Sequence, residues 1–274
     1  MDDKNSQFIG YESLNTETHI AKYFVDQEST KVVLLKTPFY AESGGQVGDT
    51  GEIEYSYQKL EVINTIKNED EFIHICKSNP DFKFSKEKVT AKVNHSKRRE
   101  IMANHTATHL LHSALRTVLG THVQQAGSLV ESDYFRFDFS HFEKVNENQL
   151  QEIEIIVNEK IRQNLEVRSQ ITSIDEAKEK GAMALFGEKY GEEVRMISID
   201  DYSLELCGGT HVSRTGQIGS VFITGESSIA SGIRRIEAVS GGAAFRLIQK
   251  RNKMINQLIT ILNSNENDLS ARVQ

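Results

Sequence analysis

The sequence predicts an α+β protein that starts with a small β-barrel and ends in a helix. Its first part, residues 8–93, has short strand-like segments separated by glycine-containing turns, a pattern typical of a small barrel. The middle of the chain mixes helical periods with strand-like alternation. From Ala243 onward, apolar residues recur every seven positions, as on one side of a long helix. We therefore predict a barrel over residues 1–95, a mixed core over residues 96–242 and a helical segment over residues 243–274.

Three segments of the first part have the composition of buried strands, and they span residues 31–36, 61–66 and 71–76. Cys76 falls at the end of the last one and needs no chemical role there. A glycine-rich stretch over residues 37–51 lies between the first two, with four glycines in its last eight residues. Glycine permits positive φ and close backbone approach, so this stretch suits a tight surface turn as well as a loop that lies against a ligand.

Helices and strands alternate in the second part of the chain. Its predicted helices span residues 98–119, 146–164 and 175–180, and its predicted strands span residues 128–142, 194–199, 204–206, 219–224 and 234–239. Gly120 is a natural end for the first of these helices. Phe135, Phe137 and Phe139 share one face of a half-buried strand, which favours a place in the core over a platform for stacking bases.

Four residues have the types and spacing of a metal site. His105 and His109 are four residues apart in a predicted helix, so they lie on one face. Cys207 and His211 form a CxxxH element at the exit of a predicted strand. Three imidazole nitrogens and one thiolate are a ligand set that Zn²⁺ takes in tetrahedral geometry. The alternative, surface histidines and a small buried cysteine, is disfavoured because the chain has only two cysteines to place. His112 follows closely and is predicted not to be a ligand.

Bulk composition is that of a soluble protein with buried cores, since 38% of the 274 residues are hydrophobic and 26% are charged. Two cysteines cannot build a disulfide framework, and no signal peptide or membrane helix is recognised, so we expect a cytoplasmic protein with no membrane partner. A net charge of −7 argues against general affinity for nucleic acid. Residues 92–99 and 246–253 are basic and acid-free, which suits either a solvated face or local contacts to a polyanion.

Six segments of the chain carry a family resemblance. They are TPFYAESGGQVGDTG (37–51), NHTATHLLHSALRTVLGTHVQQAGSLV (104–130), FRFDFSH (135–141), GAMALFGEKYG (181–191), ELCGGTHVSRTGQIG (205–219) and ASGIRRIEAVSGG (230–242). In this order they closely resemble the editing domain of bacterial-type alanyl-tRNA synthetase. Stand-alone alanyl-tRNA editing proteins, which act in trans, share its HxxxH and CxxxH elements. No segment resembles the synthetase's aminoacylation or tRNA-recognition domains, so we expect a fragment, with residues 243–274 starting the link to a missing C-terminal domain.

The resemblance implies a deacylase that hydrolyses serine, and also glycine, from mischarged alanine tRNA. The other expected partner is the rest of the synthetase chain, to which aminoacylation and ATP binding would belong. The implied fold is a barrel followed by an antiparallel sheet packed with helices, as in the threonyl-tRNA synthetase editing domain. The four zinc-ligand positions of the family, for one Zn²⁺ ion, match His105, His109, Cys207 and His211. Thr37 matches a threonine associated with discrimination of serine, and Gln125 matches a glutamine that lines the pocket.

Ester hydrolysis needs further groups, and the sequence offers candidates for them. The backbone amides around Gly44, Gly45, Gly208 and Gly209 can donate hydrogen bonds to an oxyanion or to the terminal phosphate. Basic residues that can contact the tRNA are Arg98, Arg99, Arg234 and Arg235.

Several alternatives stay open at this point. Four protein ligands usually mark a structural zinc site, so the ion can position the substrate or activate water. Thr37 can bind the seryl hydroxyl or simply end a strand before Pro38. Arg234 and Arg235 can face the acceptor stem or pair with Glu237. The chain itself can be a synthetase domain, a free-standing trans-editing deacylase, or a non-catalytic, zinc-stabilised module that binds tRNA.

Overall fold

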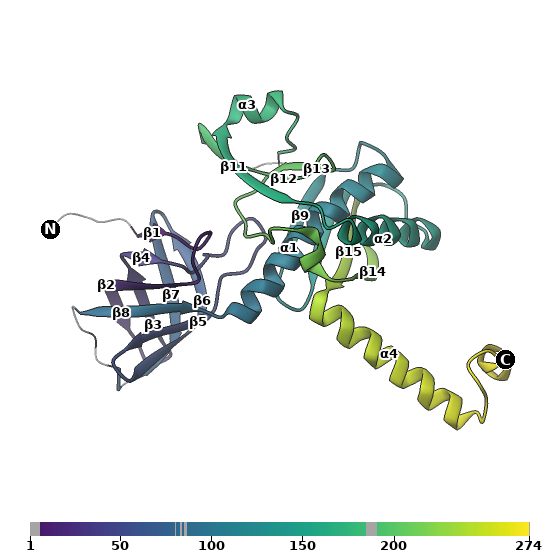
Figure 1. Cartoon of the computed structure of the whole chain (residues 1–274), viewed down its shortest axis with the longest axis horizontal. Coiled ribbons are helices and arrows are strands. Elements are labelled where there is room, and N and C mark those ends of the chain that lie inside the picture. Colours follow the sequence, from purple (N-terminus) through teal and green to yellow (C-terminus); the bar gives the residue numbers. More distant parts are fainter. Residues whose placement is uncertain (1–5, 80, 83, 85–86, 185–190, 274) are drawn as a thin grey trace.

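A computed structural model of the chain describes residues 6–79, 81–82, 84, 87–184 and 191–273. Figure 1 shows a barrel at one end, a core of sheets and helices beside it, and a long helix, α4, that projects away from the core. Helix α1 leads from the barrel into the core. The predicted α+β fold, with an N-terminal barrel, antiparallel sheets packed with helices and a C-terminal helix, is confirmed.

Six antiparallel strands close the barrel in the order β2-β3-β7-β6-β5-β8. Their bounds are β2 Asn15–Val25, β3 Ser29–Leu34, β5 Gly51–Tyr55, β6 Gln58–Asn68, β7 Glu71–Lys77 and β8 Lys88–Val93. In β6, Leu60 and Val62 are buried while Lys59 and Glu61 are exposed, because successive side chains point to opposite faces. The inward residues form an apolar core that includes Cys76, for which the sequence indicated no chemical role. Short strands β1 (Gln7–Phe8) and β4 (Lys36–Thr37) pair beside the barrel.

Helix α1 (His95–Leu119) connects the barrel to the core and carries half of the candidate metal site. It begins where the side chain of Asn94 accepts a hydrogen bond from the Lys97 backbone N–H at 3.1 Å. It ends before Gly120, whose φ of 116° disfavours other residues. Residues from 103 to 115 are all buried, because the helix is covered on several sides.

The main sheet has the order β14-β15-β10-β9 and is packed against α1 and α2 (Glu147–Arg162). Its strands are β9 Gln125–Val130, β10 Phe135–Ser140, β14 Val221–Ala230 and β15 Ile233–Ser240. The three phenylalanines of β10 are buried, as predicted. The prediction of one strand over residues 128–142 is wrong, because the polar residues 131–133 turn the chain into a β9–β10 hairpin, closed by a 3.0 Å hydrogen bond from Glu131 N–H to Tyr134 O.

A smaller sheet has the order β11-β12-β13, and its last strand ends directly before Cys207. Its strands are β11 Val167–Ser173, β12 Glu193–Ile199 and β13 Ser203–Leu206, and α3 (Ile174–Glu179) packs on β11 and β12. Strand β11 was not predicted, because most of its side chains are exposed and it lacks an apolar pattern. The family-like segment 181–191 lies largely outside the described residues, which omit 185–190.

The remaining elements follow the CxxxH loop. They are a short 3₁₀ helix, η1 (Thr215–Ile218), then the strands β14 and β15, then α4 (Gly241–Ile261) and α5 (Leu269–Val273). Helix α4 starts two residues before its predicted start and buries only Ala244. Helix α5 lies within residues 243–274, where a helical segment was predicted, but residues 262–268 between α4 and α5 are not helical. No described helix has the length and apolar character needed to cross a membrane.

Candidate metal centre

The four predicted ligands come together. His105 and His109 extend from α1, while Cys207 and His211 lie in the loop after β13. Their ligand atoms all lie within 4.8 Å of one another. The Cys207 Sγ atom is 3.4 Å from His105 Nε2 and 3.3 Å from His211 Nε2. A helix face and a distant loop therefore build one group that can hold a metal ion.

Each of the three histidines is held through its other ring nitrogen, Nδ1. His105 Nδ1 donates to the Gln46 side-chain oxygen at 2.8 Å. His109 Nδ1 lies 3.0 Å from a Glu205 carboxylate oxygen. His211 Nδ1 lies 3.3 Å from the Thr106 hydroxyl. Because Nδ1 is occupied in all three rings, each Nε2 is left as the metal-binding atom.

The donor set fits a zinc ion. His109 Nε2 is buried and forms no hydrogen bond of normal geometry to any residue in the described part of the chain. A buried polar atom without a partner is unfavourable, and a cation in this group would satisfy it. Imidazole nitrogens and a thiolate are ligands that Zn²⁺ binds well. His112 is not part of the group, in line with its prediction as a non-ligand.

The charge state of Cys207 favours metal binding. Burial would raise the pKa of the Cys207 thiol, but nearby His105 and His211 hold that pKa well below its usual value. Burial lowers the pKa of His211 to about 3, so its ring is neutral. Burial would also lower the pKa of His109, but Glu205 outweighs it and raises that pKa to about 10. Cys207 is therefore a thiolate, which is the form that binds metal ions.

A cavity of about 260 Å³ lies against this group. Three of the ligands, His105, His109 and Cys207, form one wall of it. The other lining residues are Tyr40, Ser43, Gly44, Thr108, Gln125, Ser128, Gly191, Glu193, Val194, Arg195, Leu206, Gly208 and Gly209. The cavity is therefore lined by both polar and apolar groups.

The catalytic residues predicted from sequence do not all reach this cavity. Gln125 and Gly44 line it. Gly45 lies behind the wall, where its φ of 83° and the nearby Ser128 carbonyl require glycine, since an added Cβ would be 2.6 Å from that oxygen. Thr37 is fully buried, and its hydroxyl is 2.7 Å from His74 Nε2. The structure therefore does not bring Thr37 to the metal group.

Of the four residues predicted to contact tRNA, Arg98 is placed where it cannot do so. It is 1% exposed and is bound to Asp49 and to backbone carbonyls, so it cannot reach a phosphate. Arg99 beside it is exposed.

The β15 arginines form ion pairs instead of projecting into solvent. Arg234 pairs with Glu226, and Arg235 with Asp138 at 2.6 Å. The predicted alternative of pairing with Glu237 is therefore wrong for both.

Sequence reasoning missed the residues that hold the ligands in place. Gln46 is fully buried and also accepts a hydrogen bond from Thr210 N–H at 2.8 Å, so it fixes the CxxxH loop as well as His105. Arg195 donates to the carbonyls of Cys207 and Gly209 at 3.0 and 2.8 Å. Glu205 is the one such residue with a signal in the sequence, because it lies two positions before Cys207 and strand alternation puts both on one side.

The second glycine of the CxxxH loop is required by the ring of a ligand. An added Cβ at Gly209 would lie 2.0 Å from His105 Cε1, and that ring is fixed by Gln46. Gly209→Ala is therefore expected to displace His105 and to weaken zinc binding by about tenfold or more. Competition with a chromophoric chelator measures this change. Gly208→Ala is the matched control, because nothing lies within 4 Å of its added Cβ; equal affinity losses in both variants would contradict the geometric explanation.

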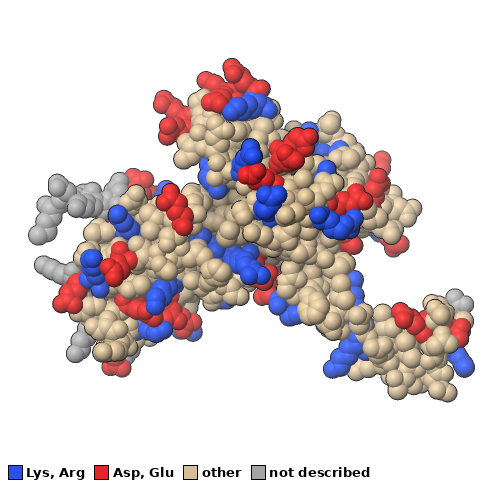
Figure 2. Space-filling model, in the orientation of Figure 1, with Lys and Arg blue, Asp and Glu red and all other residues tan. Residues whose placement is uncertain are grey.

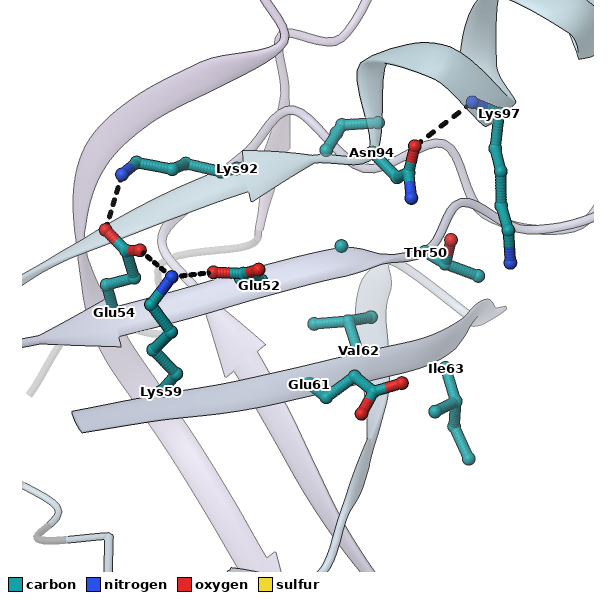
Figure 3. Close-up of a pocket in the computed structure, with 12 residues that line it drawn as sticks. Thr50, Glu52, Glu54, Lys59, Glu61, Val62, Ile63, Lys92, Asn94 and Lys97 are labelled. Carbon is teal, nitrogen blue, oxygen red and sulfur yellow. Dashed lines mark hydrogen bonds and ion pairs between the residues drawn. The ribbon is translucent and has the colours of Figure 1, made fainter.

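A second cavity, of about 590 Å³, lies on the barrel wall and does not have this chemistry (Figure 3). Lys59 lies between Glu52 and Glu54, and Lys92 pairs with Glu54. The charged side chains of this cavity therefore neutralise one another. Among the described residues that line it, none is histidine or cysteine. The candidate site is therefore the cavity beside the metal group.

Two family models match the chain. The model for the threonyl and alanyl tRNA synthetase second additional domain matches residues 194–237, which include Cys207 and His211. The model for class II (A) tRNA synthetases matches residues 1–97, a range that includes the barrel strands.

Curated relatives give the same result over nearly the whole chain. An alanine–tRNA ligase from Cytophaga hutchinsonii is 50% identical over 275 residues, covering 98% of this chain and 31% of the relative. Those from Hydrogenovibrio crunogenus and Pseudoalteromonas translucida are 47% and 44% identical, covering 98% and 99% of this chain and 32% of each relative. The chain thus spans about a third of the length of these relatives. It belongs to the alanyl-tRNA synthetase family, in the region that carries the second additional domain.

Proposed function

We propose that this chain edits mischarged alanine tRNA by hydrolysing the ester of serine, and of glycine, as the editing domain of an alanyl-tRNA synthetase. The observation that carries the proposal is a small cavity with three residues of a complete set of zinc ligands in its wall. An aminoacyl ester is hydrolysed when an oriented water attacks its carbonyl while the oxyanion is stabilised. A bound Zn²⁺ would supply a positive charge that polarises or orients groups in the cavity.

The protein groups around the cavity suit positioning of the substrate. Four protein ligands leave no open position in a tetrahedral site, so we favour a zinc ion that holds and orients over one that activates water. The backbone at Gly44, Gly208 and Gly209 borders the cavity, and its amides are candidate donors to the oxyanion. Glu193 and Arg195 also line the cavity. The carboxylate can bind the amino group of the substrate, and the guanidinium can bind its phosphate.

The site must hydrolyse the seryl ester but not the alanyl ester, so it must recognise the hydroxyl that serine has and alanine lacks. We assign this recognition to Thr108 and Gln125, which both line the cavity. Thr108 donates its hydroxyl hydrogen to His105 O at 2.7 Å, so its oxygen can still accept one from serine. In the described part of the chain, the Gln125 side-chain amide forms no hydrogen bond, so it can bind the substrate. A site that hydrogen-bonds a hydroxyl can strongly reject a substrate that lacks it.

The partners of this activity are the acceptor end of alanine tRNA and the rest of a synthetase chain. Figure 2 shows acidic and basic side chains interspersed over one face, with acidic residues gathered around α3. No single-sign surface covers that face, in keeping with a net charge of −7 and with local contacts to phosphate. We place the activity in the cytoplasm, because neither Cys76 nor Cys207 forms a disulfide, which suits a reducing environment.

Single-turnover hydrolysis tests the proposal. With zinc, the chain is expected to hydrolyse seryl-tRNA(Ala) and to spare alanyl-tRNA(Ala), and chelation is expected to abolish hydrolysis until zinc is restored. Thr108→Val is expected to lower hydrolysis of the seryl ester by about tenfold or more relative to the glycyl ester. Thr117→Val is the matched control, because Thr117 makes a similar hydroxyl-to-carbonyl bond in the same helix but is exposed. Thr37→Val is expected to leave the ratio unchanged.

The main competing function is a zinc-stabilised module that binds tRNA without catalysis. The closed set of four ligands favours it, because such sites are usually structural. Binding of tRNA without hydrolysis above background would favour this module and contradict the deacylase. A free-standing trans-editing protein would have the same activity, and would differ only in acting without a synthetase chain.

A further inference from the structure

A buried carboxylate, Glu205, lies directly behind the metal group. It is 2% exposed and is the third residue of β13, two positions before Cys207. Side chains two positions apart in a strand point the same way. The same strand end therefore delivers the thiolate to the metal group and the carboxylate behind it.

Glu205 is bracketed by two imidazoles of α1. Its Oε2 atom is 3.0 Å from His109 Nδ1 and 3.3 Å from His112 Nδ1. Its Oε1 atom accepts a 3.0 Å hydrogen bond from the Ser203 hydroxyl. His109 and His112 are three residues apart and therefore share one helix face. One imidazole is a metal ligand and the other is not, and both contact the same carboxylate oxygen.

A buried carboxylate is unfavourable unless positive charge and hydrogen bonds surround it. A divalent cation bound by three neutral imidazoles and one thiolate leaves one positive charge. Glu205 supplies the negative charge that brings the buried group to neutrality. The ligands His105 and His211 are held instead by the uncharged side chains of Gln46 and Thr106. Among the described partners of the three Nδ1 atoms, Glu205 is therefore the one charged side chain.

We propose that Glu205 is the positioning residue of the metal centre. By accepting from His109 Nδ1–H it orients the ring with Nε2 toward the ion, and its charge strengthens the binding of a divalent cation. His112 Nδ1 lies 3.3 Å from the same carboxylate oxygen on the other side, but neither ring nitrogen of His112 forms a hydrogen bond of normal geometry to a described residue. This inference rests on the proposed metal site, but it does not require that the chain hydrolyse any ester.

Zinc affinity of the full chain, measured by competition with a chromophoric chelator, tests the proposal. Glu205→Ala is expected to weaken zinc binding by about 10- to 100-fold. Glu205→Gln retains the shape and an acceptor oxygen but no charge, so it is expected to show a smaller loss of about tenfold. The visible spectrum of the Co²⁺-loaded chain is expected to change in Glu205→Ala, because His109 is free to turn. Glu192→Gln, an exposed glutamate outside the cavity lining, is expected to keep both properties.

The outcomes separate this inference from the proposed function. Wild-type zinc affinity and an unchanged Co²⁺ spectrum in both Glu205 variants would overturn the role of Glu205. If Glu205→Ala does not fold, as judged by circular dichroism, Glu205→Gln decides the question, since it fills the same volume. A wild-type chain that binds zinc but hydrolyses no seryl-tRNA would refute the deacylase and leave the Glu205 test intact. A wild-type chain that binds no zinc would refute both.

Discussion

Replacing Arg98 with methionine is expected to lower the free energy of unfolding by about 3–5 kcal/mol, because it leaves Asp49 as a buried charge without a partner. Both side chains are 1% exposed. Arg98 Nε donates to the two Asp49 carboxylate oxygens at 2.9 and 3.0 Å. Asp49 also accepts from Tyr40 N–H at 2.7 Å. The carboxylate would therefore keep one backbone partner and lose its only counter-charge in the described surroundings.

The guanidinium also joins segments that are distant in sequence. Its Nη1 donates to Gly10 O at 2.8 Å and its Nη2 to Pro38 O at 3.0 Å. These carbonyls belong to the segments beside β1 and β4, whereas Arg98 lies in the first turns of α1. The pair therefore fixes the direction in which α1 leaves the barrel. Because His105 and His109 lie on the same helix, this direction also sets where the metal ligands lie.

Urea unfolding of the wild type and the variants measures the effect. Arg99→Met is the matched control, since Arg99 is exposed, and is expected to change stability by less than about 0.5 kcal/mol. Replacing both Arg98 and Asp49 with apolar residues is expected to destabilise by less than the sum of the single changes. A stable Arg98→Met variant with weakened tRNA affinity would restore the prediction that Arg98 contacts phosphate.

The fold was largely predictable because its signals are local. The helical periodicity and the flanking turn residues predict the start of α1 to within three residues. The apolar alternation of β6 and β7 can be recognised without knowing a partner strand or a ligand. Errors arise where tertiary contacts decide. Strand β11 has few apolar residues and is held by its pairing with β12. The burial of Arg98 could not be predicted, because its partner carbonyls lie 88 and 60 residues away.

The candidate site was predictable to a different depth. The four ligands have rare residue types at regular spacings, so the sequence identifies them without a fold. Their supporting residues have common types and no spacing rule: Gln46 is 59 residues from His105, which it holds. For Thr37 the sequence was misleading: its match to the family suggests a pocket residue, whereas in the structure its hydroxyl lies beside His74. Position in three dimensions, which separates these cases, is not encoded in any short pattern.

The fully buried His74 is expected to make the barrel sensitive to acid. Its Nδ1–H donates to Val32 O at 2.9 Å, so Nε2 must accept from the Thr37 hydroxyl at 2.7 Å. This arrangement satisfies a neutral ring, and burial lowers the pKa of His74 to about 4, although the Val32 carbonyl opposes the shift. In the unfolded chain the pKa of histidine is about 6.5. The folded state therefore resists a proton that the unfolded state accepts.

The sign of the pH dependence follows from these two pKa values. Above pH 6.5 both states have a neutral ring, and the histidine contributes no pH dependence. Between pH 6.5 and 4 only the unfolded chain takes up the proton, so stability falls by about 1.4 kcal/mol per pH unit and by about 3 kcal/mol in all. Below the folded-state pKa both states are protonated and this loss levels off.

Comparing urea unfolding of the wild type and of His74→Gln from pH 7.5 to pH 4 isolates this contribution, because the other titrating groups are common to both chains. The variant is expected to be less stable at pH 7.5, where it loses buried hydrogen bonds, but to lose less stability on acidification. His95→Gln, a change at an exposed position, is expected to keep the wild-type slope. If His74→Gln and the wild type have parallel pH profiles, His74 is protonated as readily in the folded barrel as in the unfolded chain. In that case the Thr37 hydroxyl would not be committed to a neutral His74, and the reason for excluding Thr37 from substrate recognition would weaken with it.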